Sequence, residues 1–292
     1  MSDYILHKGE LYHHGIKGMK WGVRRYQNPD GSLTPDGIKR YQSECNKQAN
    51  KGNSRGDLTR SRTIPAGTKM YRTSTNNNET LNGSTYVSYL DVDRNHYKGG
   101  HIRYRDNAAK AYEYEYTLQS DLRLPSREDQ QKIVNDVVRS NKKYLSESVK
   151  AWVDVAIPEG TWSRVEIENY HDGGVKKFIE NSMKQWRKTT PEQLAYSVCQ
   201  SMGLAPNVKK EVISELKKQG YNAMVDEASV GGRNGWAKEG YDPLIIFDSS
   251  VLSTDNVKQI SKFEENRARN KDAQWLRKVN SSKNTTARWS AV

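Results

Sequence analysis

Tyr112-Glu113-Tyr114-Glu115-Tyr116-Thr117-Leu118 alternates aromatic or apolar residues with acidic or polar ones. Alternate side chains of a strand point to opposite faces, so this period of two predicts a half-buried strand with one aromatic and one acidic face. Pro243-Leu244-Ile245-Ile246-Phe247-Asp248 is the most apolar strand candidate in the chain. A continuous apolar run of this length is typical of a strand in the middle of a sheet.

Helix signals fill the chain between these two strands. Ser126 precedes two acidic residues, and Thr190-Pro191-Glu192-Gln193 combines an N-cap, a proline at the first helical position and a capping box. Apolar residues at helical spacing follow in residues 126–138, 175–186, 190–202 and 207–219. Further strand candidates lie at residues 69–73, 84–90 and 221–225. Strands, then helices, then strands predict one mixed α+β domain over residues 63–255.

The two ends of the chain differ from this central part. The 292 residues carry a net charge of +12, 34% are hydrophobic, and the mean hydropathy is −0.96. Lys and Arg are dense in residues 17–62 and 258–288. We therefore expect a tag with a flexible basic linker at residues 1–62 and a basic polar tail at residues 256–292.

Several classes of protein do not fit this composition. No apolar run approaches the length needed to span a bilayer, and the N-terminus lacks the charged and apolar regions of a secretion signal. Cys45 and Cys199 show no metal-ligand spacing, and the adjacent His13 and His14 lack partners for a tetrahedral site. We expect no membrane association, no metal and a reducing compartment.

One N-terminal run has neither helical nor strand periodicity. It reads His14-Gly15-Ile16-Lys17-Gly18-Met19-Lys20-Trp21-Gly22-Val23-Arg24-Arg25-Tyr26-Gln27-Asn28, and continues as DGSLTPDGIKRY through residue 41. It resembles a tag found near the ends of proteins encoded by tailed phages and prophages. The resemblance implies a phage capsid or assembly protein as a partner of residues 12–41. It also implies a location in the virion, the host bacterial cytoplasm, or both.

A second resemblance concerns the start of the central domain. Gly67-Thr68-Lys69-Met70-Tyr71-Arg72 is similar to the first core strand of ADP-ribosyltransferases of the Arg-Ser-Glu type, and Tyr86-Val87-Ser88 is similar to their next motif. The family's usual Ser-Thr-Ser is here Val-Ser-Tyr, with only the central serine kept. The resemblance implies an ADP-ribosyltransferase-like split sheet and a mono-ADP-ribosyltransferase with NAD as substrate. It places Arg72, Tyr71, Tyr86 and Tyr97 at the NAD, and Ser88 among the catalytic residues.

The acid that the family requires has two candidates. Asp226-Glu227 follows a predicted strand and enters a glycine-rich loop, whereas Glu166-Ile167-Glu168 is a literal Glu-x-Glu. We favour Asp226 and Glu227 because an acid at a strand end beside a glycine loop can frame a ligand. In such a site the planar arginine fork suits a pyrophosphate, and a carboxylate stabilises the oxocarbenium ion as nicotinamide leaves.

Other readings of the same residues stay open. Arg72 at a strand end is commonly a surface ion-pair partner, and Glu227 a solvated carboxylate. The whole chain could then be a non-enzymatic head or virion component. Alternatively, its basic segments could serve a nucleic-acid-binding accessory protein. The target modified by an enzyme of this kind would be a host protein or nucleic acid.

Overall fold

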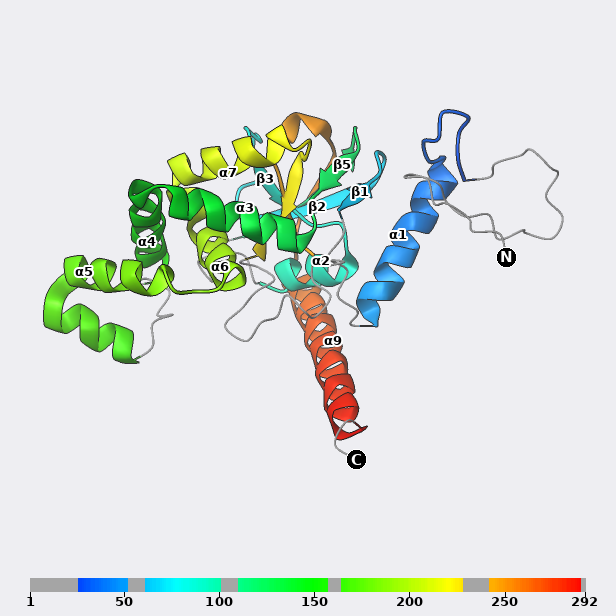
Figure 1. Cartoon of the computed structure of the whole chain (residues 1–292). Coiled ribbons are helices and arrows are strands. Elements are labelled where there is room, and N and C mark those ends of the chain that lie inside the picture. Colours follow the sequence, from blue (N-terminus) through cyan, green and yellow to red (C-terminus); the bar gives the residue numbers. More distant parts are fainter. Residues whose placement is uncertain (1–25, 52–60, 101–109, 157–163, 228–241, 290–292) are drawn as a thin grey trace.

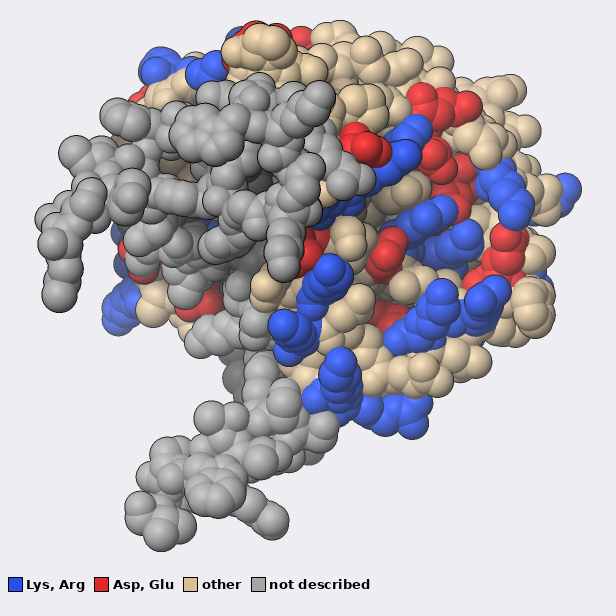
Figure 2. Space-filling view, turned by 90° about the vertical axis from the view of Figure 1, so that its right-hand side faces the viewer, with Lys and Arg blue, Asp and Glu red and all other residues tan. Residues whose placement is uncertain are grey.

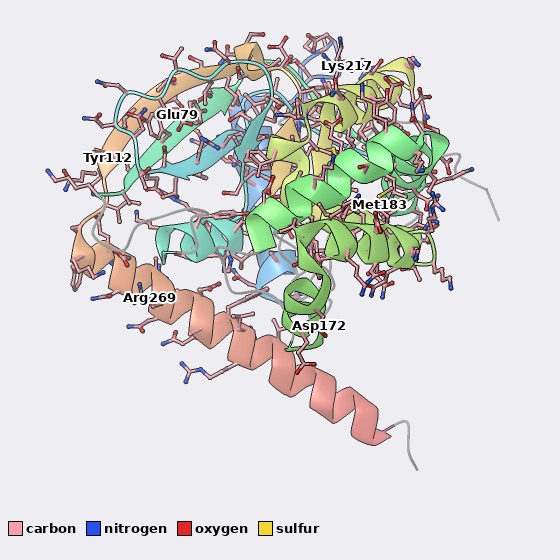
Figure 3. All side chains as sticks on the ribbon, turned by 90° about the vertical axis from the view of Figure 1, so that its left-hand side faces the viewer. Glu79, Tyr112, Asp172, Met183, Lys217 and Arg269 are labelled. Carbon is pink, nitrogen blue, oxygen red and sulfur yellow. The ribbon has the colours of Figure 1, made fainter. Side chains whose placement is uncertain are left out.

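The computed structural model describes residues 26–51, 61–100, 110–156, 164–227 and 242–289, and within them the predicted α+β class is confirmed. Strands gather on one side of the body and helices α3 to α7 on the other, with α9 leaving the body below them (Figure 1). Figure 3 shows the same division: Glu79 and Tyr112 lie on the strand side, and Met183 and Lys217 on the helical side.

The first sheet has the order β2-β4-β8 and is antiparallel throughout. Its strands are β2 (Lys69–Ser74), β4 (Tyr112–Leu118) and β8 (Leu252–Gln259). The alternation predicted for β4 is present, with Tyr114, Tyr116 and Leu118 buried on one face. Glu113, on the acidic side of the strand, is buried rather than exposed. Its burial is possible because Arg94 and Lys98 pair with its carboxylate at 2.6 and 2.9 Å.

The second sheet has the order β3-β7-β6 and is also antiparallel. It consists of β3 (Thr85–Val87), β7 (Leu244–Ile246) and β6 (Ala223–Val225). The apolar strand β7 lies in the middle, as its composition predicted. A separate antiparallel pair joins β1 (Arg62–Ile64) to β5 (Leu122–Leu124).

The second sheet separates two apolar cores. Val87, Leu244 and Val225 point into a core shared with the first sheet. Met224 and Ile245 point into a helical core. That core is formed by α3 (Arg127–Ser140), α4 (Lys142–Ala156), α5 (Arg164–Trp186), α6 (Pro191–Ser201), η1 (Met202–Leu204) and α7 (Pro206–Lys218).

The predicted helix starts are seen at atomic detail. Ser126 Oγ accepts from the Asp129 N–H at 3.0 Å, and Thr190 and Gln193 form a reciprocal capping box. Helix α5 is interrupted at Gly174, whose φ of 65° and ψ of 178° lie outside the helical region and are accessible mainly to glycine. A short helix, η3 (Ser249–Val251), joins the two sheets between β7 and β8.

The structure differs from the expected flexible linker before residue 62. Helix α1 (Pro35–Asn50) begins at the Thr34 N-cap and buries Cys45 and Ala49 in the core of the first sheet. Composition alone pointed to a linker because the apolar side of α1 is narrow and its remaining residues are polar.

The expected tail after residue 255 also differs from the structure. Strand β8 crosses that boundary and pairs with β4 as far as Gln259. Helix α9 (Lys262–Trp289) then packs on α2 (Asp91–Lys98) and buries Ala268, Trp275 and Val279. These residues recur at helical spacing, but the many polar residues between them masked the pattern.

Helix α9 also closes the end of α1. The Trp275 indole N–H donates to the Ala49 carbonyl at 2.9 Å, and Lys278 Nζ donates to the Asn50 carbonyl at 3.2 Å. The last carbonyls of a helix lack partners within the helix and carry its partial negative charge, so both donors stabilise this end. The two ends of the chain therefore support each other.

Candidate functional site

The two three-stranded sheets meet at one backbone bridge. Tyr71 of β2 and Ser88, just after β3, exchange two backbone hydrogen bonds of 2.7 and 2.8 Å. The register of the second sheet places Val87, Leu244 and Val225 opposite one another. The next row is therefore Ser88, Pro243 and Asp226, and the Asp226 N–H donates to the Pro243 carbonyl at 2.8 Å. Tyr71, Ser88, Pro243 and Asp226 form what we name the junction row.

Of the residues predicted from the sequence, Tyr71, Ser88 and Asp226 belong to the junction row, and Arg72 and Glu227 are each adjacent to it. Neighbouring strands lie about 4.8 Å apart, so Ser88 and Asp226 are about 10 Å apart along the row. Both are 2% exposed. A ligand reaches either side chain only after the groups that cover it move.

The Arg72 guanidinium has three acceptors in the structure. Its Nε and Nη2 donate to the two carboxylate oxygens of Glu79 at 3.1 and 2.6 Å, and its Nη1 donates to the Tyr86 carbonyl at 3.1 Å. Burial by itself favours the neutral acid, but Arg72 outweighs it and lowers the pKa of the Glu79 carboxyl. The fork that the sequence assigned to a pyrophosphate therefore holds the chain's own carboxylate.

The loop that carries Glu79 is fixed by one tyrosine. Tyr114 Oη accepts from the Glu79 N–H at 3.0 Å and donates to the Asn76 carbonyl at 2.7 Å. The Arg72 and Glu79 side chains remain 22% and 21% exposed. This ion pair is thus ordered but accessible to solvent.

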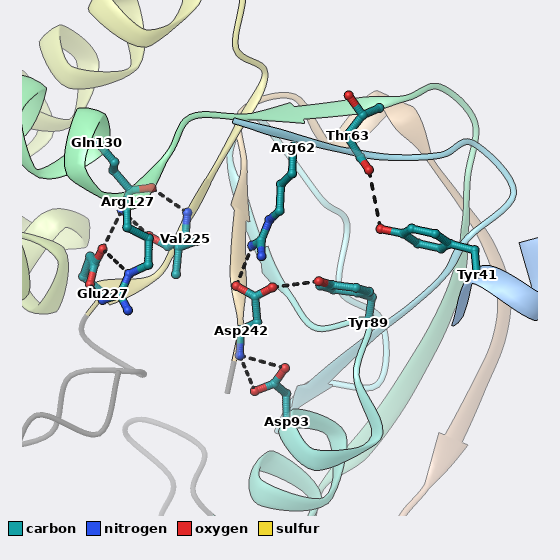
Figure 4. A network of polar contacts seen from close by, with 10 residues as sticks. All are labelled: Tyr41, Arg62, Thr63, Tyr89, Asp93, Arg127, Gln130, Val225, Glu227 and Asp242. Carbon is teal, nitrogen blue, oxygen red and sulfur yellow. Dashed lines mark hydrogen bonds and ion pairs between the residues drawn. The ribbon is translucent and has the colours of Figure 1, made fainter. Parts of the chain in front are cut away.

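Glu227 lies in a different environment, among the polar residues that begin helix α3 (Figure 4). Arg127 Nε donates to it at 3.1 Å, and Arg127 Nη2 makes a second bond to its other oxygen. Gln130 Nε2 adds a contact of 3.3 Å. The two side chains of the ion pair are only 2% and 5% exposed. Burial raises the pKa of Glu227, and Arg127 opposes that rise.

Gln130 also completes the edge of the second sheet. Its Oε1 accepts from the Val225 N–H at 2.8 Å, and its Nε2 donates to the Val225 carbonyl at 2.9 Å. The side-chain amide thereby pairs with β6 as a neighbouring strand would. Helix α3 is consequently locked to the strand that carries Asp226 and Glu227.

A second buried carboxylate network lies beside the first (Figure 4). Asp242 pairs with Arg62 at 2.6 Å and accepts from the Tyr89 hydroxyl at 2.7 Å. The Asp242 backbone N–H donates to the two oxygens of Asp93 at 3.0 and 3.2 Å. Burial, reinforced by the charge of Asp242, raises the pKa of Asp93 well above its ordinary value.

The three tyrosines that the resemblance placed at the NAD have other contacts. The Arg94 guanidinium lies over the Tyr71 ring, with its central carbon Cζ 3.9 Å from the centroid of the ring. Tyr86 packs against the helical core. Tyr97 lies on α2, with its ring edge-on to His96 at 5.6 Å. Only Tyr71 belongs to the junction row.

Several sequence expectations fall elsewhere. Glu166 and Glu168, the alternative acids, lie on helix α5, and Glu168 is exposed. Residues 1–25, which include His13 and His14, and the glycine-rich residues 228–241 lie outside the described residues. Within the described ranges, no cluster of His, Cys, Asp and Glu has the arrangement of a metal site. None of the helices in those ranges is long and apolar enough to cross a membrane.

Sequence analysis missed the residues that hold these acids. Arg127 and Gln130 continue the buried stripe of α3 toward its N-terminus, ahead of Ile133, Val134 and Val137. Polar residues at apolar positions of a helix were the available signal. Asp242 stands directly before the most apolar strand, and a carboxylate at that position was the signal for the second network.

The chain matches one family model, a family of unknown function (DUF7211), over residues 3–28. The match covers the N-terminal tag and ends before the first described helix. No curated protein and no solved structure matches the chain. The functional argument therefore depends on the chain's own residues.

Proposed function

We propose that the chain binds NAD across the junction row and transfers its ADP-ribose to a host macromolecule. The observation that carries this proposal is the register of the two sheets. It brings Arg72, Ser88 and Asp226, which lie apart in the sequence, to the region where the two sheets join, with β7 between Ser88 and Asp226. A site that must hold a phosphate, a nicotinamide and a ribose requires such a convergence.

Arg72 is the phosphate-binding residue in this proposal. A carboxylate and a phosphate present similar pairs of oxygens to a guanidinium, so the two can replace each other at a planar fork. Glu79 occupies the place that a phosphate of NAD would take. Because the pair is partly exposed, the exchange costs little desolvation.

Ser88 and Asp226 would act at the nicotinamide riboside. The bond between the ribose C1′ and the nicotinamide nitrogen breaks, and its electron pair leaves with nicotinamide. The Asp226 carboxylate stabilises the positive charge that develops on the ribose, and a nucleophile of the target then forms a bond to C1′ and loses its proton. We assign this role to Asp226 because it belongs to the junction row, whereas Glu227 lies beyond the row and is held by Arg127.

Labelled NAD tests the proposal with the full-length chain. We expect nicotinamide release and label transfer to a host lysate by the wild type, and loss of at least 100-fold in both Arg72→Gln and Asp226→Asn. Arg123→Gln, an exposed arginine on β5, is the matched control and should retain full activity. Absence of NAD binding by the folded wild type would refute the proposal, as would equal loss in the control.

The N-terminal tag supports a second element of the proposal, recruitment to a phage particle. The family match ends at residue 28, ahead of helix α1, which supports treating this first part of the tag as a unit apart from the α+β body. We propose that residues 12–41 bind a capsid or assembly protein and carry the body into the virion. A chain without residues 1–25 should keep NAD turnover but no longer copurify with particles. Retention of the shortened chain in particles would contradict this role.

A further inference from the structure

A groove runs between helices α2 and α9, on a part of the molecule that the proposed transferase site does not use. Its volume is about 820 Å³. Its α9 wall presents Arg267, Lys271, Gln274 and Lys278, and its α2 wall presents Arg94, Asn95 and Lys98. Charged and amide side chains therefore dominate both walls.

The residues of the α9 wall form one stripe. Positions 267, 271, 274 and 278 follow one another at steps of four, three and four, so they lie on one side of the helix. The first and last residues of the stripe are eleven positions apart, which corresponds to about 16 Å of helix. That length corresponds to about five phosphates of a nucleic-acid strand at roughly 3.4 Å each.

Charges in the groove differ in whether they are already paired. Arg94 and Lys98 both bind Glu113. The acids Glu264 and Asp272 contact Lys258 and His96 at 2.7 and 3.1 Å. Arg267 and Lys271, both exposed, make no ion pair with any other residue in the described part of the chain. The five Lys and Arg side chains that line the groove outnumber its three carboxylates, Asp91, Glu264 and Asp272, so the groove carries a net positive charge.

The cations of the groove lie on a surface of mixed charge. On the face shown in Figure 2, Lys and Arg side chains lie beside Asp and Glu side chains. In the groove, Arg267 and Lys271 follow one another on α9, and the amides of Asn95 and Gln274 lie on its two walls.

The helix that carries the stripe is held rigidly enough to present it. Trp275 and Val279 are buried, and the Trp275 and Lys278 bonds to the end of α1 fix the orientation of α9. Arg267, Lys271 and Gln274 precede or adjoin these anchors. Their backbone positions are therefore set before any ligand binds.

We propose that the groove between α2 and α9 binds a single-stranded nucleic acid, with Arg267, Lys271 and Lys278 each on a phosphate. Asn95 and Gln274 can both donate and accept hydrogen bonds, as the edges of unpaired bases require. An acidic polypeptide would match the cations but would leave these amides without base partners.

Fluorescence anisotropy with a fluorescein-labelled 20-nucleotide oligo(dT) tests this on the full-length chain. Three phosphate contacts predict a slope of about −2 in log K against log salt. Arg267→Gln/Lys271→Gln should weaken binding about tenfold at 50 mM salt and bring the slope to roughly −0.7. Lys262→Gln/Arg277→Gln removes the same charge from another side of α9, outside the groove, and should change the affinity less than about twofold.

Three results would overturn the proposal. The first is no binding by the wild type, and the second is an equal loss in the two double variants. The third is displacement of the labelled strand by polyglutamate as effective as by unlabelled oligo(dT), which would assign the groove to an acidic protein. Nicotinamide release in the same variants should be unchanged, which separates this site from the transferase proposal.

Discussion

Arg72–Glu79 and Arg127–Glu227 are the same chemical pair in two environments. Each arginine binds both oxygens of its glutamate. The first pair joins residues seven positions apart and is about one-fifth exposed, whereas the second joins residues 100 positions apart and is almost fully buried. An exposed pair gains little net free energy, but breaking a buried pair leaves a charge without water or partner.

The difference in burial between the two pairs indicates which one can bind a ligand and which one stabilises the fold. Arg72 can exchange Glu79 for a ligand's phosphate at small cost. Arg127 cannot release Glu227 without disturbing the contact between α3 and β6. The account therefore assigns ligand binding to the accessible pair and fold stability to the buried one.

Breaking the buried pair should have the largest effect on stability. We expect Arg127→Met to lower the free energy of unfolding by about 3–5 kcal/mol, because Glu227 would remain buried and unpaired. Urea denaturation followed by circular dichroism measures this loss. Arg127→Met/Glu227→Met should recover most of it, since both charges are then gone.

Arg72→Met is the matched control for that experiment. It should cost about 1 kcal/mol or less. Similar losses in the two arginine variants would remove the distinction between the pairs.

The third pair, Arg62–Asp242, provides an intermediate case. Arg62 is 20% exposed and Asp242 only 3%. Tyr89→Phe removes the hydroxyl that donates to Asp242 and should cost about 1.5–3 kcal/mol, the usual range for a hydrogen bond to a charged group. A thermal or urea titration showing no loss would mean that Arg62 alone satisfies this carboxylate.

Asp93, next to that pair, should make stability depend on pH. Its pKa is raised in the folded chain, so the folded state keeps a proton that the unfolded state loses above about pH 4. The stabilising contribution is therefore complete at acidic pH and declines as pH rises toward the folded pKa. Asp93→Asn cannot ionise, so its free energy of unfolding should fall less between pH 5 and 8 than that of the wild type. Parallel pH profiles for the two proteins would contradict a raised pKa.

Glu79→Gln should have the smallest effect on stability, within about 1 kcal/mol, and the opposite effect on binding. Removing the competing negative charge leaves Arg72 more available, so NAD should bind several-fold more tightly in calorimetry. Glu115→Gln is the matched control, because Glu115 pairs with Lys69 at 3.3 Å and not with Arg72. Weaker NAD binding by Glu79→Gln would argue against the exchange.

Much of the fold could be predicted from local patterns. The alternation in β4, the apolar run of β7 and the caps at Ser126 and Thr190 are short-range signals, and each determined its element. The packing of helix α9 was not predicted, because its buried Trp275 and Val279 are spaced correctly but separated by polar residues. Its partner, the end of α1, is more than 200 positions away, and no local pattern reveals it.

Local patterns likewise indicate only some residues of the candidate site, because its other residues are brought there by long-range contacts. Arg72 and Glu227 belong to strand motifs that are visible in the sequence, whereas the identities of their partners, Glu79 and Arg127, depend on which loop and helix lie over them. The identity of an ion-pair partner is a tertiary property. Sequence reasoning therefore named the arginine and the acids but not the contacts that distinguish exchangeable from structural ones.

A crystal structure of the full-length chain with a non-hydrolysable NAD analogue tests the central claim most directly. The account predicts a phosphate on the Arg72 guanidinium, the Glu79 carboxylate displaced from it, and the nicotinamide riboside beside Ser88 and Asp226, with Arg127–Glu227 unchanged. An intact Arg72–Glu79 pair with the analogue absent or bound elsewhere would contradict it.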